Sequence, residues 1–269
     1  MVEKINNKLS IIKYGSNTLV KQEEDGQISI DYENIQAHGS IINSIQNPAI
    51  IVSSGAIAFG KTFKNDFQYV DDEIVRKRIF SAIGNPHLSI LWDKAIPNKR
   101  VLQSLLTHRD LSSESSKEKI SQIILSLYKM NESVIQINDN DFVTDEELVR
   151  MRGGDFGDND KITALLAKLC SSLFKNVEVV FNTSSDGVLE NNKVIPSLNA
   201  DRLTDQYIND LCGTSKTKLG AGGMHSKLKI IRDTLNETEN LEVRVINGKK
   251  PEQLKSILSG KNIGTKIYK

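Results

Sequence analysis

The sequence has few cysteines and no long hydrophobic run, and each shortage excludes a class of protein. Its 269 residues include two cysteines, Cys170 and Cys212, which are too few for a disulfide framework and lack metal-ligand spacing. No apolar run approaches the roughly 20 residues that span a bilayer. The first residues are polar where a secretion signal needs an apolar core. These features predict a soluble, cytoplasmic protein with reduced thiols.

The charges are balanced, which removes a second group of functions. There are 35 Lys and Arg residues against 34 Asp and Glu residues, so the formal net charge is +1. Proteins that bind nucleic acids or anionic membranes usually concentrate basic residues on one face. We therefore expect neither a nucleic-acid partner nor a membrane partner.

Short apolar segments alternate with segments of helical periodicity. The apolar segments lack polar alternation, which is typical of strands buried on both faces of a parallel sheet. Helices between them would cover both faces, so the pattern predicts an α/β fold in one domain, residues 1–269. The expected strands are 9–13, 49–53, 101–106, 133–137, 177–181, 242–246 and 265–268, and the expected helices include 74–92, 159–172, 224–235 and one after Pro251.

Polar residues follow the expected strands at the edge where parallel sheets bind ligands. Lys13 ends the first strand and Gly15 follows, and a cation beside backbone N–H groups freed by glycine suits a phosphate. Ser54 and Gly55 follow the second strand, where a hydroxyl and a close backbone can grip a carboxylate or a phosphate. A solvated lysine and an ordinary serine cap are the alternatives at these two places.

Two clusters of aspartate and asparagine stand at the same predicted edge. Residues 138–141 read Asn-Asp-Asn-Asp after one strand, and residues 157–160 read Gly-Asp-Asn-Asp before a helix. Such residues are common in turns and N-caps, which is the alternative. Carboxylates and amides together can also hold an ammonium group, orient lysines and fix Mg²⁺-bound water.

A glycine-rich loop at 220–223 is predicted to lead into a helix that carries Lys227. Glycines at a helix N-terminus expose N–H groups to a phosphate, and the lysine adds a charge. The chain has neither a P-loop nor a dinucleotide-binding glycine fingerprint. Triplets at 108–110 and 155–157 imitate a protein kinase, but the remaining segments of that family are missing, so this reading is rejected.

Together these segments resemble the amino acid kinase family, and within it the glutamate 5-kinase (γ-glutamyl kinase) branch. The resemblance covers nearly the whole chain, in family order. The segments that carry it are Ile12-Lys-Tyr-Gly-Ser16, Ile51-Val-Ser-Ser-Gly-Ala-Ile-Ala-Phe-Gly60, Ser81-Ala-Ile-Gly84, Leu105-Leu-Thr107, Ile137-Asn-Asp-Asn-Asp-Phe-Val143, Phe156-Gly-Asp-Asn-Asp160, Ser185-Asp-Gly-Val188, Gly220-Ala-Gly-Gly-Met-His-Ser-Lys227 and Gly264-Thr265.

The resemblance implies a three-layer αβα sandwich with a mainly parallel central sheet. It also implies that ATP, with Mg²⁺ held mainly through ATP, phosphorylates the γ-carboxylate of L-glutamate in the first step of L-proline synthesis. Lys13 and Lys227 would contact the transferring phosphoryl group, and Asp160 would hold both lysines. The implied glutamate-binding residues are Ser54, Gly55, Asn138, Asp141, Asp158 and Asn159, and the implied ATP-binding residues are Lys13, Gly15, Thr183, Ser184, Asp186, Ala221, Gly222, Gly223, Met224, His225, Ser226 and Lys227.

The sequence departs from the family at a few positions. Ser184 stands where an aspartate is usual, Asp139 replaces a customary glutamate, and Ala221 replaces a frequent threonine or serine. The chain resembles the form without the additional C-terminal PUA domain. The family precedent is a homodimer or homotetramer with L-proline as feedback inhibitor. Two alternatives stay open: a sister kinase acting on another carboxylate, and a non-catalytic binding protein of the same fold.

Overall fold

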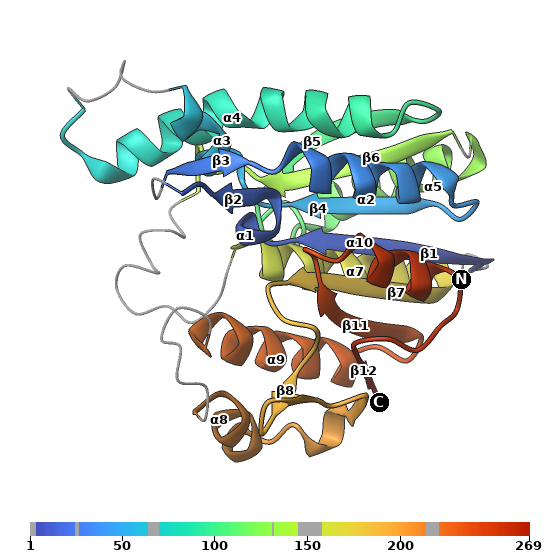
Figure 1. Ribbon diagram of the computed structural model, residues 1–269. Helices are drawn as coiled ribbons and strands as arrows, with labels where there is room; N and C mark the ends of the chain where they lie inside the picture. The colour runs from blue at the N-terminus through green and yellow to red at the C-terminus, as the bar shows by residue number, and fades with distance from the viewer. Residues whose placement is uncertain (1–3, 25–26, 64–69, 131, 145–157, 214–220) are drawn as a thin grey trace.

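An eight-stranded sheet forms the centre of the protein in the computed structural model (Figure 1). The structure describes residues 4–24, 27–63, 70–130, 132–144, 158–213 and 221–269. Across the sheet the order is β10 (Ser197–Asn199), β12 (Thr265–Tyr268), β11 (Leu241–Asn247), β7 (Phe174–Thr183), β1 (Ile5–Tyr14), β4 (Ala49–Ser53), β6 (Ser133–Asp139) and β5 (Arg100–Leu106).

The strands from β11 to β5 are parallel to one another, whereas β12 pairs antiparallel with β11. All five residues of β4 are buried, as expected for a strand in the middle of a covered sheet. The carboxyl ends of β1, β4, β6 and β7 therefore meet at one edge. That edge carries the polar segments that the sequence singled out.

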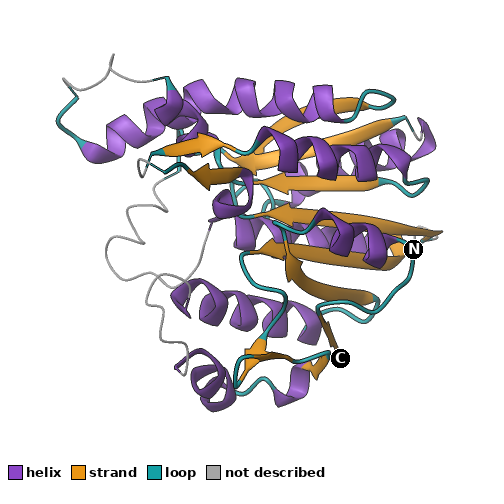
Figure 2. Ribbon diagram, in the orientation of Figure 1, coloured by secondary structure: helices purple, strands orange, loops and turns teal. Residues whose placement is uncertain are grey.

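Helices cover both faces of the sheet and give three layers (Figure 2). One face is covered by α2 (Tyr32–Ser44), α3 (Ala56–Thr62), α4 (Glu73–Ala95) and α10 (Pro251–Leu258), and the other by α5 (Glu114–Met130), α7 (Asp158–Leu173), α8 (Asp205–Gly213) and α9 (Ala221–Asn236). The remaining elements are α1 (Ser16–Leu19), the hairpins β2 (Val20–Gln22) with β3 (Ile28–Ile30) and β8 (Leu189–Glu190) with β9 (Lys193–Val194), and a 3₁₀ turn at Ala200–Arg202.

The alternation of side chains along β1 decides which layer each site residue enters. Leu9 and Ile11 pack against the α5, α7, α8 and α9 layer, whereas Ile12 and Tyr14 pack against the α2, α4 and α10 layer. Because successive side chains in a strand point to opposite faces, Lys13 follows Leu9 and Ile11 toward α7 and α9. The side chains of adjacent β1 residues, such as Lys13 and Tyr14, therefore enter the helix layers on opposite faces of the sheet.

Helices α3 and α4 approach each other so closely that glycine is required where they meet. A Cβ atom on Gly60 would lie 1.9 Å from the carbonyl oxygen of Phe80. A Cβ atom on Gly84 would lie 1.8 Å from the carbonyl oxygen of Ala56. Separations this short are impossible between real atoms, so the two backbones touch with no side chain between them.

The sequence prediction is confirmed for the class of fold and for a mainly parallel sheet between helices. The prediction of a loop through residue 223 is wrong, because α9 begins at Ala221 and includes Gly222 and Gly223. Glycine is tolerated in the first helical turn, whose N–H groups have no partners within the helix. The two hairpins and β10 were not predicted, since each strand in them is at most three residues long.

Candidate active site

Three charged side chains from three elements meet at the carboxyl edge of the sheet. Lys13 comes from β1, Asp160 from the first turn of α7, and Lys227 from α9. The Lys13 ammonium lies 2.6 Å from Oδ1 of Asp160, and the Lys227 ammonium lies 2.5 Å from Oδ2. Lys227 Nζ also lies 4.9 Å from the centre of the Phe181 ring. One carboxylate therefore holds two cations side by side, an arrangement we call the ion triad.

Burial makes the ion triad electrostatically strong. Each of its three side chains is only 9% exposed. Burial alone acts to raise the pKa of Asp160, but the ammonium groups of Lys13 and Lys227 outweigh it and hold this pKa well below its usual range. Asp160 is thus held as an anion between two lysine side chains.

Polar side chains from α4, β6, the turn after β6 and α7 form a second feature of the edge. Asn159 Nδ2 donates to Oδ1 of Asn138 (2.9 Å), and Asn138 Nδ2 donates to Oδ1 of Asn85 (2.7 Å). Asn85 Nδ2 donates to Oγ of Ser81 (3.1 Å), whose hydroxyl donates to Oδ2 of Asp141 (2.6 Å). These five residues form one continuous series of hydrogen bonds, which we call the amide chain.

The turn after β4 lies beside the end of β1. The backbone N–H of Ser54 donates to the carbonyl of Tyr14 at 3.0 Å, and Gly55 adopts a φ of 109°, which favours glycine. The hydroxyl of the preceding Ser53 accepts a hydrogen bond from Nε1 of Trp92 at 3.1 Å. The turn is therefore anchored to both β1 and α4.

The turn after β7 is held by the loop between β11 and α10. Thr183 Oγ1 donates to the carbonyl of Ile246 at 3.1 Å. The Asp186 carboxylate accepts from Asn247 Nδ2 at 3.1 Å and Gln253 Nε2 at 3.0 Å, and it pairs with Lys250 at 2.7 Å. Both oxygens of Asp186 are thus occupied by donors from this loop and from α10.

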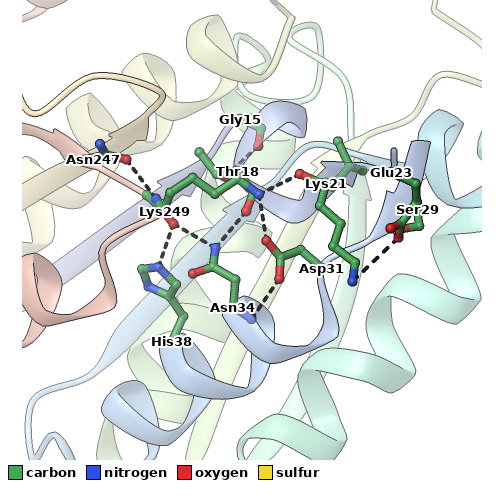
Figure 3. Close-up of polar contacts among 12 residues, drawn as sticks. Gly15, Thr18, Lys21, Glu23, Ser29, Asp31, Asn34, His38, Asn247 and Lys249 are labelled. Carbon is green, nitrogen blue, oxygen red and sulfur yellow. Dashed lines mark hydrogen bonds and ion pairs between the residues drawn. The ribbon is translucent and has the colours of Figure 1, made fainter. Parts of the chain in front are cut away.

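A neutral cluster on the other face fixes the same loop, and Figure 3 shows two of its members, Asn34 and His38. His38 Nε2 lies 3.0 Å from the carbonyl oxygen of Gly248, and His38 Nδ1 lies 3.0 Å from the hydroxyl of Tyr14. A carbonyl only accepts, so Nε2 carries the proton and the Tyr14 hydroxyl donates to Nδ1. Asn34 Nδ2 donates to the same Gly248 carbonyl at 2.7 Å. We call Tyr14, His38, Asn34 and Gly248 the glycine clamp.

Burial sets the charge state of the glycine clamp. It lowers the pKa of His38 to about 4 and raises the pKa of Tyr14 well above its usual value. Both side chains are therefore neutral across the physiological pH range. A Cβ atom on Gly248 would lie 2.6 Å from Cγ2 of Thr18 and 2.8 Å from Cβ of Asn182, so the loop sits tightly against α1 and β7.

Comparison with known proteins places the chain among kinases, although no family model matches it. It is 31% identical to a glutamate 5-kinase of Prochlorococcus marinus over 81% of this chain and 59% of that protein. It is 28% identical to a glutamate 5-kinase of Haemophilus influenzae over 98% of this chain and 69% of that protein. A glutamate 5-kinase of Kosmotoga olearia is 29% identical over 94% of this chain and 67% of that protein.

Solved structures agree on the fold. The uridylate kinase of Archaeoglobus fulgidus superposes with a TM-score of 0.54, 18% identity and coverage of 97% of this chain and 99% of that one. An isopentenyl phosphate kinase superposes with a TM-score of 0.58, 15% identity and coverage of 96% and 99%. The chain therefore shares the fold of these kinases, and its sequence is similar to those of the glutamate 5-kinases. It spans between 59% and 69% of the length of the three curated relatives named above.

The structure brings most of the residues singled out by sequence to one edge of the sheet. Lys13, Asp160 and Lys227 touch, and Asn138, Asn159 and Asp141 share the amide chain. The side chains of Asp158 and Ala221 and the surroundings of Gly222 lie outside what the structure describes. Their contacts, like the roles implied by the resemblance, stay predictions.

The other residues that the resemblance implies for ATP binding lie around α9 and the turn after β7. Ser184 is exposed. His225 Nε2 lies 2.7 Å from Oδ1 of Asn209, and Ser226 Oγ donates to the carbonyl of Gly223 at 3.3 Å. Met224 packs partly buried against the core of the α7 and α9 layer. The backbone of Gly15 donates weakly to the carbonyl of Asn182 at 3.4 Å.

Sequence reasoning missed two members of the amide chain and the whole glycine clamp. Ser81 and Asn85 are both buried, at 1% and 3% exposure, and are spaced four residues apart on α4. Two buried polar residues on one helical face are unusual, and the four-residue spacing of Ser81 and Asn85 is the one sequence feature that could indicate their role. His38 carried none, because a lone histidine in a helical pattern has no motif around it.

Two searches of the described residues bear on the type of site. Across them, no group of three or more His, Cys, Asp or Glu side chains is placed to hold a metal ion. In the same parts of the chain, none of the helices combines the length and the apolar character needed to cross a membrane.

Proposed function

We propose that this protein is an amino acid kinase that transfers the γ-phosphoryl group of ATP to the γ-carboxylate of L-glutamate, giving γ-glutamyl phosphate and ADP. The ion triad carries the proposal. Two ammonium groups held by one buried carboxylate supply fixed positive charge where the transferring group becomes most negative. The catalytic unit of the proposal is residues 1–269.

The nucleophile of this reaction needs little activation. A carboxylate is already ionised near neutral pH, so catalysis rests on positioning and on neutralising charge rather than on a general base. Lys13 and Lys227 fit this requirement because they come from separate elements and converge on the same carboxylate. Asp160 keeps both ammonium groups in place and, with both oxygens engaged, is not available as the base.

The nucleotide would lie against the start of α9 and the turn after β7. The first turn of α9 offers backbone N–H groups and the positive end of the helix dipole to phosphate oxygens. Asp186, which the resemblance implies for ATP binding, also orders the loop at Asn247 and Lys250 through its hydrogen bonds. Its direct contact with ATP stays part of the proposal.

Mg²⁺ fits this site as a partner of the nucleotide. The donor set at the edge consists of two lysines that occupy both oxygens of Asp160, which suits phosphate oxygens rather than a bare cation. Mg²⁺ commonly binds through substrate phosphates and water with one or two carboxylates. Bound in this way, it would neutralise phosphate charge, while the protein's own lysines orient the transferring group.

The relatives support L-glutamate as the acceptor. Those compared above are named glutamate 5-kinase, at 28% to 31% identity over 81% to 98% of this chain. A sister kinase of the same fold is the second candidate. Control by L-proline and assembly into a homodimer or homotetramer belong to the same proposal and rest on the family resemblance.

Acyl-phosphate trapping tests the proposal. The protein is incubated with ATP, Mg²⁺ and hydroxylamine, and hydroxamate is measured with L-glutamate, L-aspartate, N-acetyl-L-glutamate, carbamate or buffer alone. We expect a signal with L-glutamate that depends on ATP. A signal confined to another acid would keep the fold and replace the substrate, and silence with every acid despite ATP binding would favour a non-catalytic protein.

A further inference from the structure

The hydrogen bonds of the amide chain can run in only one direction, because the backbone N–H of Asp139 and the carboxylate of Asp141 fix it from its two sides. The backbone N–H of Asp139 donates to Oδ1 of Asn138 at 3.0 Å, and an N–H can only donate. Asn138 must therefore turn its Nδ2 toward Asn85. Asn85 in turn offers its own Nδ2 to Ser81, so the one hydroxyl proton of Ser81 goes to the Asp141 carboxylate. An amide flip anywhere in the chain would set two donors or two acceptors face to face.

This direction determines what the two ends of the chain present. At one end Asn159 uses its Nδ2 on Asn138, so its oxygen is turned away from the chain. That oxygen is buried and has no hydrogen-bond partner within the described part of the chain. At the other end stands the Asp141 carboxylate. Both ends are hydrogen-bond acceptors, and a group with several donors, such as an ammonium, is the ligand that such acceptors suit.

The middle of the chain is built as a rigid support. Ser81 and Asn85 lie on α4, and their exposures are 1% and 3%. The carbonyl of Asn85 accepts from Nε2 of Gln103 on β5 at 3.2 Å. α4 itself touches α3 backbone to backbone at Gly60 and Gly84. A buried hydrogen-bonded group on such an element holds its partner's orientation more strictly than a loop residue can.

We propose that Ser81 and Asn85 are positioning residues that orient Asp141 and Asn159 toward the ammonium group of the amino-acid substrate. Neither residue needs to touch the substrate. They make the site select an acid with a free amino group over one without it. The inference rests on the proposed function and adds that this side of the site recognises the amino group of the substrate.

The test compares L-glutamate with glutarate, which has the same two carboxylates but no amino group. Ser81→Ala breaks the link to Asp141 alone, and Asn85→Leu breaks the links to both ends. We expect Ser81→Ala to lower the glutamate-to-glutarate ratio of kcat/KM by about 10-fold, the usual value of one well-placed hydrogen bond. The change should come from the KM for glutamate, with kcat and the KM for ATP nearly unchanged.

Matched variants separate positioning from stability. Ser81→Thr keeps the hydroxyl and should restore most of the ratio. Ser171→Ala, at a buried helical serine that donates to the carbonyl of Lys168 far along α7, should leave it unchanged. Asn85→Asp keeps the acceptor for Asn138 and nearly the same shape. It replaces Asn85→Leu if that variant does not fold, and we expect it to match Ser81→Ala.

The outcomes are distinct. An unchanged ratio in folded Ser81→Ala and Asn85 variants would overturn the inference and leave the proposed function standing. Equal losses of kcat with both acids would overturn it as well, because they indicate a merely structural role. A wild-type protein that phosphorylates no glutamate would overturn the proposed function, and with it the substrate named here.

Discussion

Lys13 and Tyr14 are neighbours on β1, yet their side chains enter opposite layers and two different kinds of polar cluster. Lys13 joins the ion triad, in which three buried groups are charged. Tyr14 joins the glycine clamp, in which the buried groups are neutral and burial keeps them so. The same edge of the sheet therefore offsets the cost of burying polar atoms in two ways: the ion triad pairs opposite charges, and the glycine clamp keeps its groups uncharged. The ion triad can attract an anionic ligand, whereas the glycine clamp only fixes the position of a loop.

The largest expected effect comes from removing the anion of the ion triad. Asp160→Ala leaves two buried ammonium groups facing each other, and we expect a loss of about 3–5 kcal/mol in the free energy of unfolding. Urea denaturation at pH 7 measures it. Asp205→Ala, which breaks the exposed pair with Arg232, is the control and should lower the free energy of unfolding far less, because exposed ion pairs contribute little. Equal losses in both variants would mean that the buried ion triad contributes no more to stability than an exposed ion pair.

The glycine clamp should make the stability of the protein depend on pH. His38 has a folded-state pKa of about 4 against an ordinary 6.5, so between these values the unfolded chain binds more protons than the folded one. Stability should therefore fall by about 3 kcal/mol as the pH drops from 6.5 to 4. His38→Phe should flatten this slope, and His225→Phe should keep it. The contribution of Asp160 is lost only at lower pH, below its ordinary pKa of 3.8, so the two clusters separate on the pH axis.

The ion triad should be the cluster that governs rate. We expect Lys227→Ala to lower kcat by about 10²-fold or more, equivalent to about 2.7 kcal/mol, while the KM for glutamate changes less. Steady-state kinetics with L-glutamate and ATP measure both constants. Lys168→Ala removes a lysine that pairs with Glu237 at the surface and should change neither. An unchanged kcat in Lys227→Ala would remove the lysine from the mechanism.

The smallest expected effect lies at the rim of the glycine clamp. Lys249 donates to the carbonyl of Val20 at 2.6 Å and pairs with Asp31 at 2.7 Å, where the two side chains are 35% and 18% exposed. Lys249→Met should cost about 0.5–1 kcal/mol, as for other partly exposed pairs. A double-mutant cycle with Asp31→Asn, repeated at high salt, measures the pair. A coupling energy above about 2 kcal/mol would mean that the partly exposed Lys249–Asp31 pair stabilises the protein as strongly as a buried pair does.

The sequence predicts the sheet and its ligand edge well because both follow from local pattern. The apolar runs that become β1, β4, β6 and β7 are buried on both faces, and polar residues follow each of them. The ion triad is a different matter. Lys13, Asp160 and Lys227 are far apart in the chain, and only the resemblance to a family joined them before the structure gave the distances.

What the sequence could not supply were contacts between elements that carry no motif. Asn85 sits within a long helical pattern, and its bond to Asn138 spans 53 positions. His38 reaches Gly248 across 210 positions. Such contacts depend on how helices lie on the sheet, and neither periodicity nor residue type encodes that placement. The start of α9 differs from its predicted position for a local reason, because consecutive glycines predict a loop but here lie in the first turn of a helix.

The contact of Gly60 and Gly84 with facing backbone determines how the site can move. Because no side chain lies between α3 and α4, neither helix can slide along the other without a clash of main-chain atoms. The turn at Ser54 and Gly55 precedes α3, while Ser81 and Asn85 belong to α4. The turn at Ser54 and Gly55 is therefore mechanically coupled to the α4 residues Ser81 and Asn85. A movement of one helix during ligand binding or release must carry the other helix with it.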